Sequence, residues 1–304
     1  MKKISLLIFT FYTIANGYCQ TSEEFHKSGI KKAYILEDYK GAITDYSKAI
    51  ELNPNYEDAY RDRGFAKCDL KDYQGAIVDY TKAIELNPIS AITYEFRGKA
   101  KNDSGDYRGA ILDYNKAIEN EPNSVEAFVR RGNTKSSLED FRGALLDYNK
   151  AIKIDPNNVK AYSNRAITKK KLQDHQGAII DYTKLIELNP NDAIEYFSRG
   201  NAKSDLQDYR GAITDYKKVI ELNPNFPSAY VFMGLSKYVL QDYLGAIADY
   251  TKAIELNPKY ASAYYVRGLV KIKLDQKDSG CLDFSKSGEL GYEVAYEAIK
   301  EYCN

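Results

Sequence analysis

The chain has 304 residues with 43 Lys or Arg and 43 Asp or Glu, so its formal net charge is zero, which argues against a nucleic-acid-binding protein. Two His, four Cys and no Trp leave little material for a metal site or a His-based active site. A hydrophobic content of 44% with 28% charged residues is typical of a folded protein and excludes a disordered one.

The N-terminal residues 1–19 have the pattern of a secretory signal peptide. Lys2 and Lys3 precede a mostly apolar run over residues 4–15, and small or polar residues follow. The run is shorter than the roughly 20 apolar residues that span a bilayer. We therefore expect an exported protein, periplasmic or secreted, with no membrane span in its mature form.

Two cleavage points fit the end of this segment. Cleavage after Cys19, which leaves Gln20 first, is favoured over cleavage after Gly17. In a third reading Cys19 is acylated and retained, as in a lipoprotein. We favour it less because the bulky Tyr18 stands where lipoprotein signals carry a small residue.

A 34-residue period organises the rest of the chain, and a fixed period of this length is typical of stacked repeat proteins. Prolines recur 34 residues apart, at Pro54, Pro88, Pro122, Pro156, Pro190, Pro224 and Pro258. Gly-Ala pairs recur with the same period, beginning at Gly41, Gly75, Gly109, Gly143, Gly177, Gly211 and Gly245. We therefore predict one array of repeats rather than two globular domains.

Each repeat is predicted to form two helices. Residues 57–70 carry small and apolar side chains at helical spacing, Asp72 is a good N-cap, and residues 75–86 form a second amphipathic stretch. Asn87 and Pro88 end the second helix, because Asn tolerates a left-handed cap and Pro cannot continue a helix. The small residues within the helices indicate close helix packing.

The pattern Tyr60…Gly64…Asp72-Tyr73…Ala76…Tyr80…Ala83…Pro88 resembles the tetratricopeptide repeat family, and the resemblance extends over about residues 23–294. It implies an all-α fold, a right-handed superhelical solenoid of about eight helix-turn-helix repeats whose first helices line a concave groove. Such a groove commonly holds a peptide or partner protein. A pentatricopeptide RNA-binding array has a similar outline, but its unit is typically one residue longer.

The predicted boundaries follow the period. We expect a short lead at 20–22, repeats 1 to 8 at 23–56, 57–90, 91–124, 125–158, 159–192, 193–226, 227–260 and 261–294, and a capping helix at 292–304. Departures from the repeat pattern fall at Ile30, Ala166, Leu185, Val219 and Ser279-Gly280-Cys281. Thr21 and Glu24 are predicted to form a capping box on the first helix.

Charged residues recur in three columns. Arg and Lys stand four residues apart on the first helices and would repel each other unless an acid lies between them, and an Asp recurs on the second helices. We predict a structural ion-pair ladder, represented by Arg97, Lys101, Asp113, Arg131, Lys135 and Asp147. The alternative is a rail that binds an anionic ligand.

Other constellations give weak signals. Residues 102–106 faintly resemble a calcium loop but form the turn of repeat 3, and Tyr114 stands where the bidentate Glu would be. His26 and His175 are far apart, and neither is expected to be catalytic or to bind a metal. We find no phosphate loop, zinc spacing or nucleophile motif, and therefore predict a non-enzyme without a cofactor.

The C-terminal residues are predicted to close the array, because an end repeat needs a cover for its apolar face. Tyr292, Ala295, Tyr296, Ile299 and Cys303 make a helical stripe. Cys281 replaces an apolar residue of repeat 8 under this cover, so we hypothesise a Cys281–Cys303 disulfide, as expected in an oxidising compartment. The alternative is two buried free thiols.

The residues expected to line the groove are mostly polar in repeats 2 to 5 and apolar in repeats 7 and 8. The apolar set is Val231, Phe232, Leu235, Tyr238, Val239, Tyr265, Val266, Leu269 and Ile272. We predict that this set binds a peptide, an amphipathic helix or a second copy of this chain. The alternative is that the cap, or the tight end of the superhelix, covers these side chains.

The sequence therefore predicts a non-catalytic scaffold that binds a peptide or partner protein in the groove of a tetratricopeptide superhelix. An accessory subunit of a cell-envelope enzyme or transporter complex fits the same pattern, because such a subunit would use the array structurally or to recruit a substrate. A single stoichiometric enzyme partner would favour the accessory subunit, and several peptide-like partners would favour the scaffold.

Overall fold

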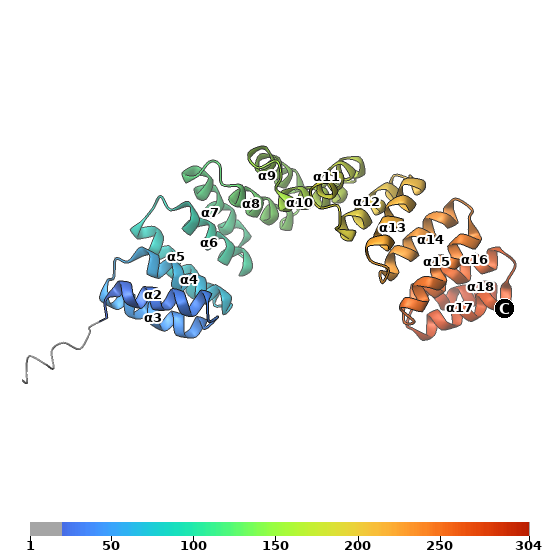
Figure 1. Cartoon of the computed structure of the whole chain (residues 1–304), viewed down its shortest axis with the longest axis horizontal. Helices are drawn as coiled ribbons and strands as arrows, with labels where there is room; N and C mark the ends of the chain where they lie inside the picture. Colours follow the sequence, from blue (N-terminus) through green and yellow to red (C-terminus); the bar gives the residue numbers. More distant parts are fainter. Residues whose placement is uncertain (1–19, 304) are drawn as a thin grey trace, which may run out of the picture. The chain divides into compact units, whose positions relative to one another are not determined.

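The computed structural model describes residues 20–303; the predicted signal peptide, with its cleavage points, lies outside the described residues, as does residue 304. Seventeen helices, α2 to α18, make up the regular structure of residues 20–303, so the described chain is all-α as predicted (Figure 1). Sixteen of them form eight helix-turn-helix repeats, and α18 follows the last repeat.

Within each repeat a first helix is followed by a second, antiparallel helix. The first helices are α2 Ser22–Tyr34, α4 Glu57–Asp69, α6 Ala91–Asp103, α8 Val125–Ser137, α10 Val159–Lys171, α12 Ala193–Asp205, α14 Pro227–Val239 and α16 Ala261–Lys273. The second helices are α3 Tyr39–Leu52, α5 Tyr73–Leu86, α7 Tyr107–Asn120, α9 Phe141–Ile154, α11 His175–Leu188, α13 Tyr209–Leu222, α15 Tyr243–Leu256 and α17 Lys277–Glu289. The C-terminal helix α18 spans Val294–Tyr302.

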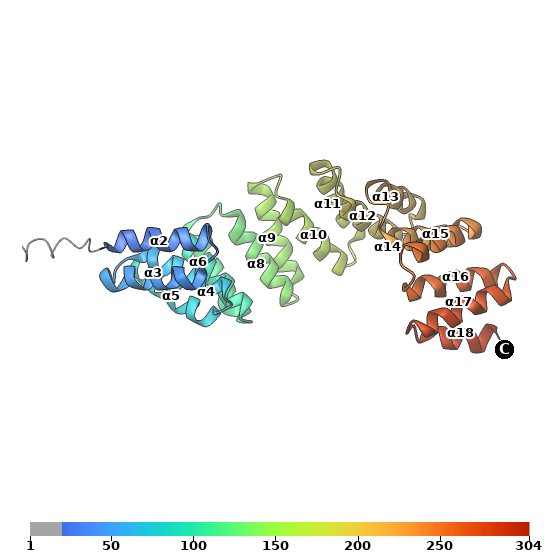
Figure 2. The same ribbon diagram turned by 60° about the horizontal axis from the view of Figure 1, so that its bottom comes forward.

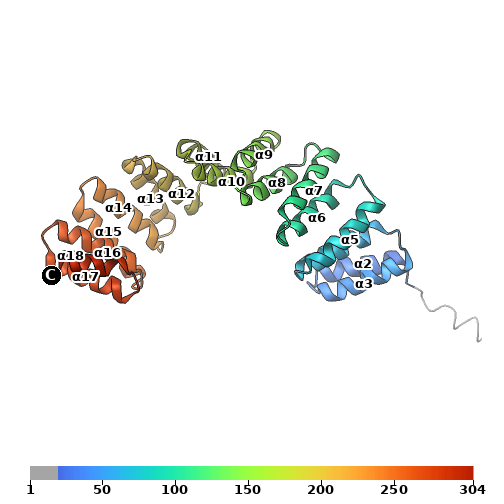
Figure 3. The same ribbon diagram turned by 180° about the vertical axis from the view of Figure 1, so that it is seen from behind.

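The chain divides into two compact units, residues 1–143 and 144–304, each of which is described here by itself. Within a unit, each first helix lies beside its own second helix, as α6 and α7 or α12 and α13 do in Figure 3. Successive first helices, such as α4 and α6 or α14 and α16, also contact each other directly. The first helices therefore form one continuous surface within each unit, which we call the inner face.

An Asp N-cap and a Gly open the second helices together. In repeat 3 the Gly109 amide donates to Asp106 Oδ1 over 2.9 Å, and the same pair recurs as Asp242 and Gly245 in repeat 7. A Cβ on Gly109 would lie 2.0 Å from the Asp106 carboxylate. The cap thus requires a residue without a side chain, which explains the recurring Gly.

The Gly of the first helix has a different role. A Cβ on Gly98 would lie 2.8 Å from the ring of Tyr114, so the helix backbone rests directly on that Tyr. Tyr114 is buried, as are Tyr46, Tyr80, Tyr148, Tyr182, Tyr216 and Tyr250 at the same repeat position. These tyrosines form the centre of each repeat, and the close approach predicted from the small residues is confirmed.

The left-handed residues lie at a different turn from the predicted one. Asn87, before Pro88, has a non-helical backbone with negative φ (−137°), because a residue that precedes Pro is disfavoured in the helical region. Positive φ instead recurs between the two helices of a repeat, at Glu37, Lys71, Gly105, Glu139, Gln173, Gln207, Gln241 and Asp275. The prediction of a left-handed Asn cap was therefore wrong.

Repeat 1 departs from the strict period by one residue. Gly29, and not Ile30, lies against the ring of Tyr46 and fills the glycine position. The turn from Tyr34 to Tyr39 is one residue longer than the turn from Asp69 to Tyr73. The predicted departure at Ile30 is therefore wrong. The first helix of repeat 1 carries the usual Gly, but one residue earlier than the 34-residue period predicts. The capping box of Thr21 and Glu24 is confirmed.

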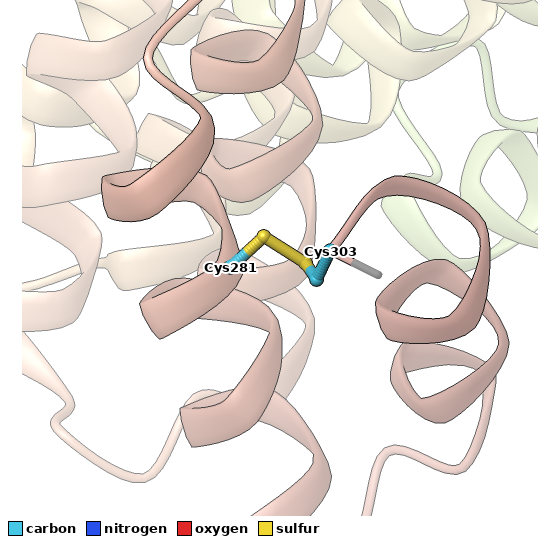
Figure 4. The surroundings of a disulfide bond; sticks show 2 residues. All are labelled: Cys281 and Cys303. Carbon is cyan, nitrogen blue, oxygen red and sulfur yellow. A yellow bond between two sulfur atoms is a disulfide. The ribbon is translucent and has the colours of Figure 1, made fainter.

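The array ends in a helix that covers the last repeat. Figure 2 shows α16, α17 and α18 side by side, with α18 against α17. A Cβ on Gly288 would lie 2.9 Å from the ring of Tyr296. The lack of a side chain at Gly288 therefore lets this ring of α18 pack closely against α17. Cys281 and Cys303 are joined by a disulfide with a Cα–Cα distance of 5.8 Å (Figure 4), which lies within the usual range for such bonds.

No helix within residues 20–303 combines the length and apolar character that crossing a bilayer requires.

Candidate functional site

The charged columns form buried ion pairs between the two helices of a repeat rather than a rail facing solvent, as repeat 3 shows. In repeat 3, Arg97 Nε and Nη2 donate to the two oxygens of Asp113 over 2.9 and 2.7 Å, and Lys101 Nζ lies 2.8 Å from Oδ2. Arg97 Nη1 also donates to Thr81 of repeat 2. Asp113 is buried, and both Arg97 and Lys101 are paired with it. These three side chains and Thr81 therefore link the two helices of repeat 3 to each other and to repeat 2.

The same arrangement recurs along the described chain. Arg63, Arg165, Arg199 and Arg267 bind Asp79, Asp181, Asp215 and Asp283 in the same bidentate way. Arg131 and Lys135 lie on α8 in the first unit, where Arg131 Nη1 donates to Asn115 over 2.6 Å. Asp147 is buried in the second unit.

Repeat 7 is the exception within the second unit. Met233 occupies the Arg position and is buried against Tyr216, so Asp249 keeps only the ammonium of Lys237, 2.7 Å away. On α13 of the preceding repeat, Lys217 stands where the other repeats carry Thr, Ser or Asn. Burial raises the pKa of Asp249, and the Lys237 ammonium opposes this shift.

The nine apolar residues predicted to bind a partner do not form one surface. Leu235, Tyr238, Val266 and Leu269 come together around a pocket of about 40 Å³ between α14 and α16. Tyr250 and Val270 complete its lining. The pocket is therefore built from the inner face of repeats 7 and 8, with the central Tyr of repeat 7 beneath it.

Two further members of the set lie on α14. Phe232 is 37% exposed, meets Phe197 edge-on at a centroid distance of 5.4 Å, and lies 6.2 Å from the ring of Tyr216. Phe226 extends the same cluster through Phe197. Val239 is 50% exposed at the end of the helix. An apolar surface thus continues from the pocket towards α12.

Of the remaining three residues, Val231 is buried, which corrects the prediction for that residue, whereas Tyr265 and Ile272 are partly exposed. Val231 is only 5% exposed and belongs to the core around Tyr250. Tyr265 contacts Tyr292 of the segment before α18, at a centroid distance of 5.1 Å, so the end of the chain partly covers it. Ile272 approaches Gly280 of α17.

Sequence reasoning missed an aromatic row on the inner face of the first unit. Tyr34 is exposed and stacks on Phe65 with a centroid distance of 5.4 Å, and Phe65 lies 6.3 Å from Phe96. Phe65 and Phe96 occupy the same repeat positions as Leu235 and Phe232, so a column-by-column reading would have found them. Next to this row, buried His26 Nε2 lies 2.8 Å from Asp62 Oδ2.

The described residues 20–303 contain no group of three or more His, Cys, Asp or Glu side chains placed to hold a metal ion. Residues 104–106 form the turn of repeat 3, directly after Asn102 and Asp103 end α6. Asp106 caps α7, Gly105 has a φ of +91°, and Asp103 pairs with Lys99.

Comparison with protein families supports the repeat assignment. A model described as "TPR repeat" matches residues 32–68, 132–173 and 234–275. Two models described as "Tetratricopeptide repeat" match residues 193–226, and residues 63–90 and 159–192. Together these matches cover more than half of the chain. No curated protein matches the sequence.

Solved structures show the same fold. The C-terminal part of a TPR repeat-containing protein from Cytophaga hutchinsonii has a TM-score of 0.71 and 20% identity, over 79% of this chain and 98% of that one. The MamA protein has a TM-score of 0.53 and 27% identity, over 57% of this chain and 94% of its own. YrrB has a TM-score of 0.56 and 23% identity, over 62% of this chain and 97% of its own. The chain therefore belongs to the tetratricopeptide repeat family.

Proposed function

We propose that this chain is a non-catalytic scaffold that binds a peptide on the inner face of repeats 6 to 8. The supporting observation is the apolar surface formed by the pocket between α14 and α16 and by half-exposed Phe232. Aromatic and aliphatic anchors around a small pocket are what a bound side chain requires. YrrB, which shares the fold, is described as a TPR protein with an unusual peptide-binding site.

We also propose that the protein is exported. The charged and apolar N-terminal pattern supports export, and the disulfide between Cys281 and Cys303 fits an oxidising compartment. Intact mass spectrometry of the native protein tests both features. We expect a chain that starts at Gln20 and in which Cys281 and Cys303 resist alkylation until a reductant is added. A native chain that keeps Met1, with both thiols alkylated at once, would contradict the proposal.

A displayed library of random peptides, selected on the full mature chain, tests the binding site. The selected peptides should lose at least about tenfold in affinity for the double variant Phe232→Asp with Leu269→Asp, because each substitution places a charge on the apolar surface. Circular dichroism should show that the variant remains helical.

The second helices of repeats 7 and 8 provide a matched control. Leu244 and Leu282 are each 72% exposed, on α15 and α17. The double variant Leu244→Asp with Leu282→Asp adds the same charge to the same two repeats and should leave peptide affinity unchanged. Equal losses in the two double variants would rule out a site on the inner face.

A further inference from the structure

The central Tyr of a repeat normally has a hydrogen-bond partner for its hydroxyl group. Tyr216 donates to Asn201 over 2.8 Å, and Tyr80 lies 3.9 Å from the sulfur of Cys68. In repeats 3, 4 and 5 the hydroxyl groups of Thr134, Thr168 and Ser198 act on Tyr114, Tyr148 and Tyr182, where their hydrogen bonding opposes the rise in pKa that burial causes. Five successive repeats thus offer the hydroxyl a polar neighbour, and they draw on four different positions of the inner face.

Repeats 1 and 7 do not: the hydroxyls of Tyr46 and Tyr250 are buried and have no hydrogen-bond partner within residues 20–303. In repeat 7, Tyr250 also lines the pocket between α14 and α16. The four positions that supply partners in the other repeats are occupied here by Leu235, Tyr238, Val266 and Val270. Three of these side chains cannot hydrogen-bond, and Tyr238 makes no such bond to Tyr250.

These same four residues line the pocket between α14 and α16. The side chains that replace the partners of the hydroxyl therefore also form walls of the pocket that Tyr250 lines. A pocket of about 40 Å³ is several times what one water-sized probe needs and suits a short side chain rather than an aromatic ring. Its walls are apolar apart from the Tyr hydroxyls, so a charged group would lose its hydration without compensation.

Tyr250 remains a neutral hydroxyl at any ordinary pH, because burial and the neighbouring Asp249 both raise its pKa. A neutral hydroxyl can donate one hydrogen bond and accept others. A buried hydroxyl without a partner is unfavourable in the free protein, and a ligand atom that pairs with it recovers that loss.

We propose that this pocket is a specificity site that receives one short side chain with a neutral hydrogen-bonding tip, such as Thr, from a bound peptide. The tip pairs with the hydroxyl of Tyr250, and the aliphatic part of the side chain contacts Leu235, Val266 and Leu269. The proposal rests on the proposed peptide-binding function and adds the chemical class of the anchor residue.

Pairs of peptides that differ only by Thr or Val test the proposal, because the two side chains have nearly the same shape. A peptide selected on the full mature chain is synthesised with Thr and with Val at each position in turn. At one position the wild type should bind the Thr peptide about fivefold more tightly, as one neutral hydrogen bond predicts. Tyr250→Phe should reverse this preference, because Val then matches a fully apolar pocket.

The chain offers a second variant that keeps the hydroxyl. Val270→Thr places at this position the residue that Thr134 and Thr168 provide in repeats 4 and 5. It should satisfy Tyr250 internally and remove the preference for Thr without loss of fold.

The outcomes separate the two proposals. If peptide binding depends on Phe232 and Leu269 but the Thr-to-Val ratio is the same in wild type and Tyr250→Phe at every position, an ordered water alone satisfies the hydroxyl and the specificity site is refuted. If no selected peptide depends on Phe232 and Leu269, the proposed function fails and the specificity site fails with it.

Discussion

Repeats 6 and 7 share a backbone plan but differ in how their polar groups are satisfied. In repeat 6, Asp215 binds Arg199 and Lys203, and the hydroxyl of Tyr216 donates to Asn201. In repeat 7, Asp249 keeps only Lys237, and the hydroxyl of Tyr250 has no partner among the described residues.

The difference shows which features of a repeat serve stacking and which do not. The Asp, the central Tyr and the Asp cap of the second helix are present in both repeats, so the fold does not require the Arg or the Tyr partner at every position. Unsatisfied polar groups in a native protein often mark functional sites. Repeat 7 combines such a group, the hydroxyl of Tyr250, with an apolar inner face, and we therefore place the ligand there.

The largest expected effect is a loss of stability when the ion pairs of repeat 6 are removed. Asp215→Ala leaves Arg199 and Lys203 facing each other in a buried setting, and should lower the free energy of unfolding by about 3 kcal/mol. Asp249→Ala releases a single Lys and should cost about 1 kcal/mol. Urea denaturation of both variants measures the difference, and equal losses would mean that the Arg contributes nothing.

The second prediction restores the ladder in repeat 7. Met233→Arg combined with Lys217→Thr recreates the pairing of Arg267 in repeat 8 with Thr251 in repeat 7. We expect a gain of about 1 kcal/mol, because charge-assisted hydrogen bonds to Asp249 outweigh the lost burial of Met233. Thermal unfolding measures the change. A clear loss of stability would show that Met233 is needed for packing against Tyr216.

The third prediction concerns the two tyrosines. Tyr216→Phe removes a satisfied hydroxyl and leaves Asn201 without its donor, which should cost about 1 kcal/mol. Tyr250→Phe removes a hydroxyl without a partner in the described chain, and should leave stability unchanged or slightly higher. Chemical denaturation compares the two variants. A comparable loss in both would show that Tyr250 is satisfied in solution.

The smallest expected effect is a pH dependence. Burial raises the pKa of Asp249, so the folded state binds this proton more tightly than the unfolded state does. Its contribution to stability is therefore full below pH 3.8, the ordinary value for Asp, and is lost as pH rises through the higher folded-state pKa. Relative to Asp249→Asn, the wild type should lose stability across this window, as unfolding measured at several pH values would show. An opposite slope would contradict the raised pKa.

The sequence predicted the repeats and the helices of each repeat, because the period fixes which residues meet. The Asp ladder also followed from the period, since charges four residues apart needed an acid. Other features depend on distances that columns do not show. The extra turn residue before Asp38 displaced the first helix, and Gly29 took the place expected for Ile30.

Within the site, the sequence pattern indicated an apolar inner face but not which of its residues are exposed and which are buried. Val231, Glu95 and Val129 are buried at one repeat position, whereas Phe197 and Tyr265 at that position are partly exposed, so polarity alone did not reveal which of them face the core. The unpaired hydroxyl of Tyr250 could not be recognised until the structure showed where the other tyrosines find their partners.

Methyl NMR of the full mature chain with a selected peptide tests the location of the site most directly. Addition of the peptide should shift and broaden the methyl signals of Leu235, Val266, Leu269 and Val270. The methyl signals of Leu112, on a second helix of the first unit, should not change. Shifts confined to methyl groups outside repeats 6 to 8, with the pocket signals unmoved at saturation, would contradict the account.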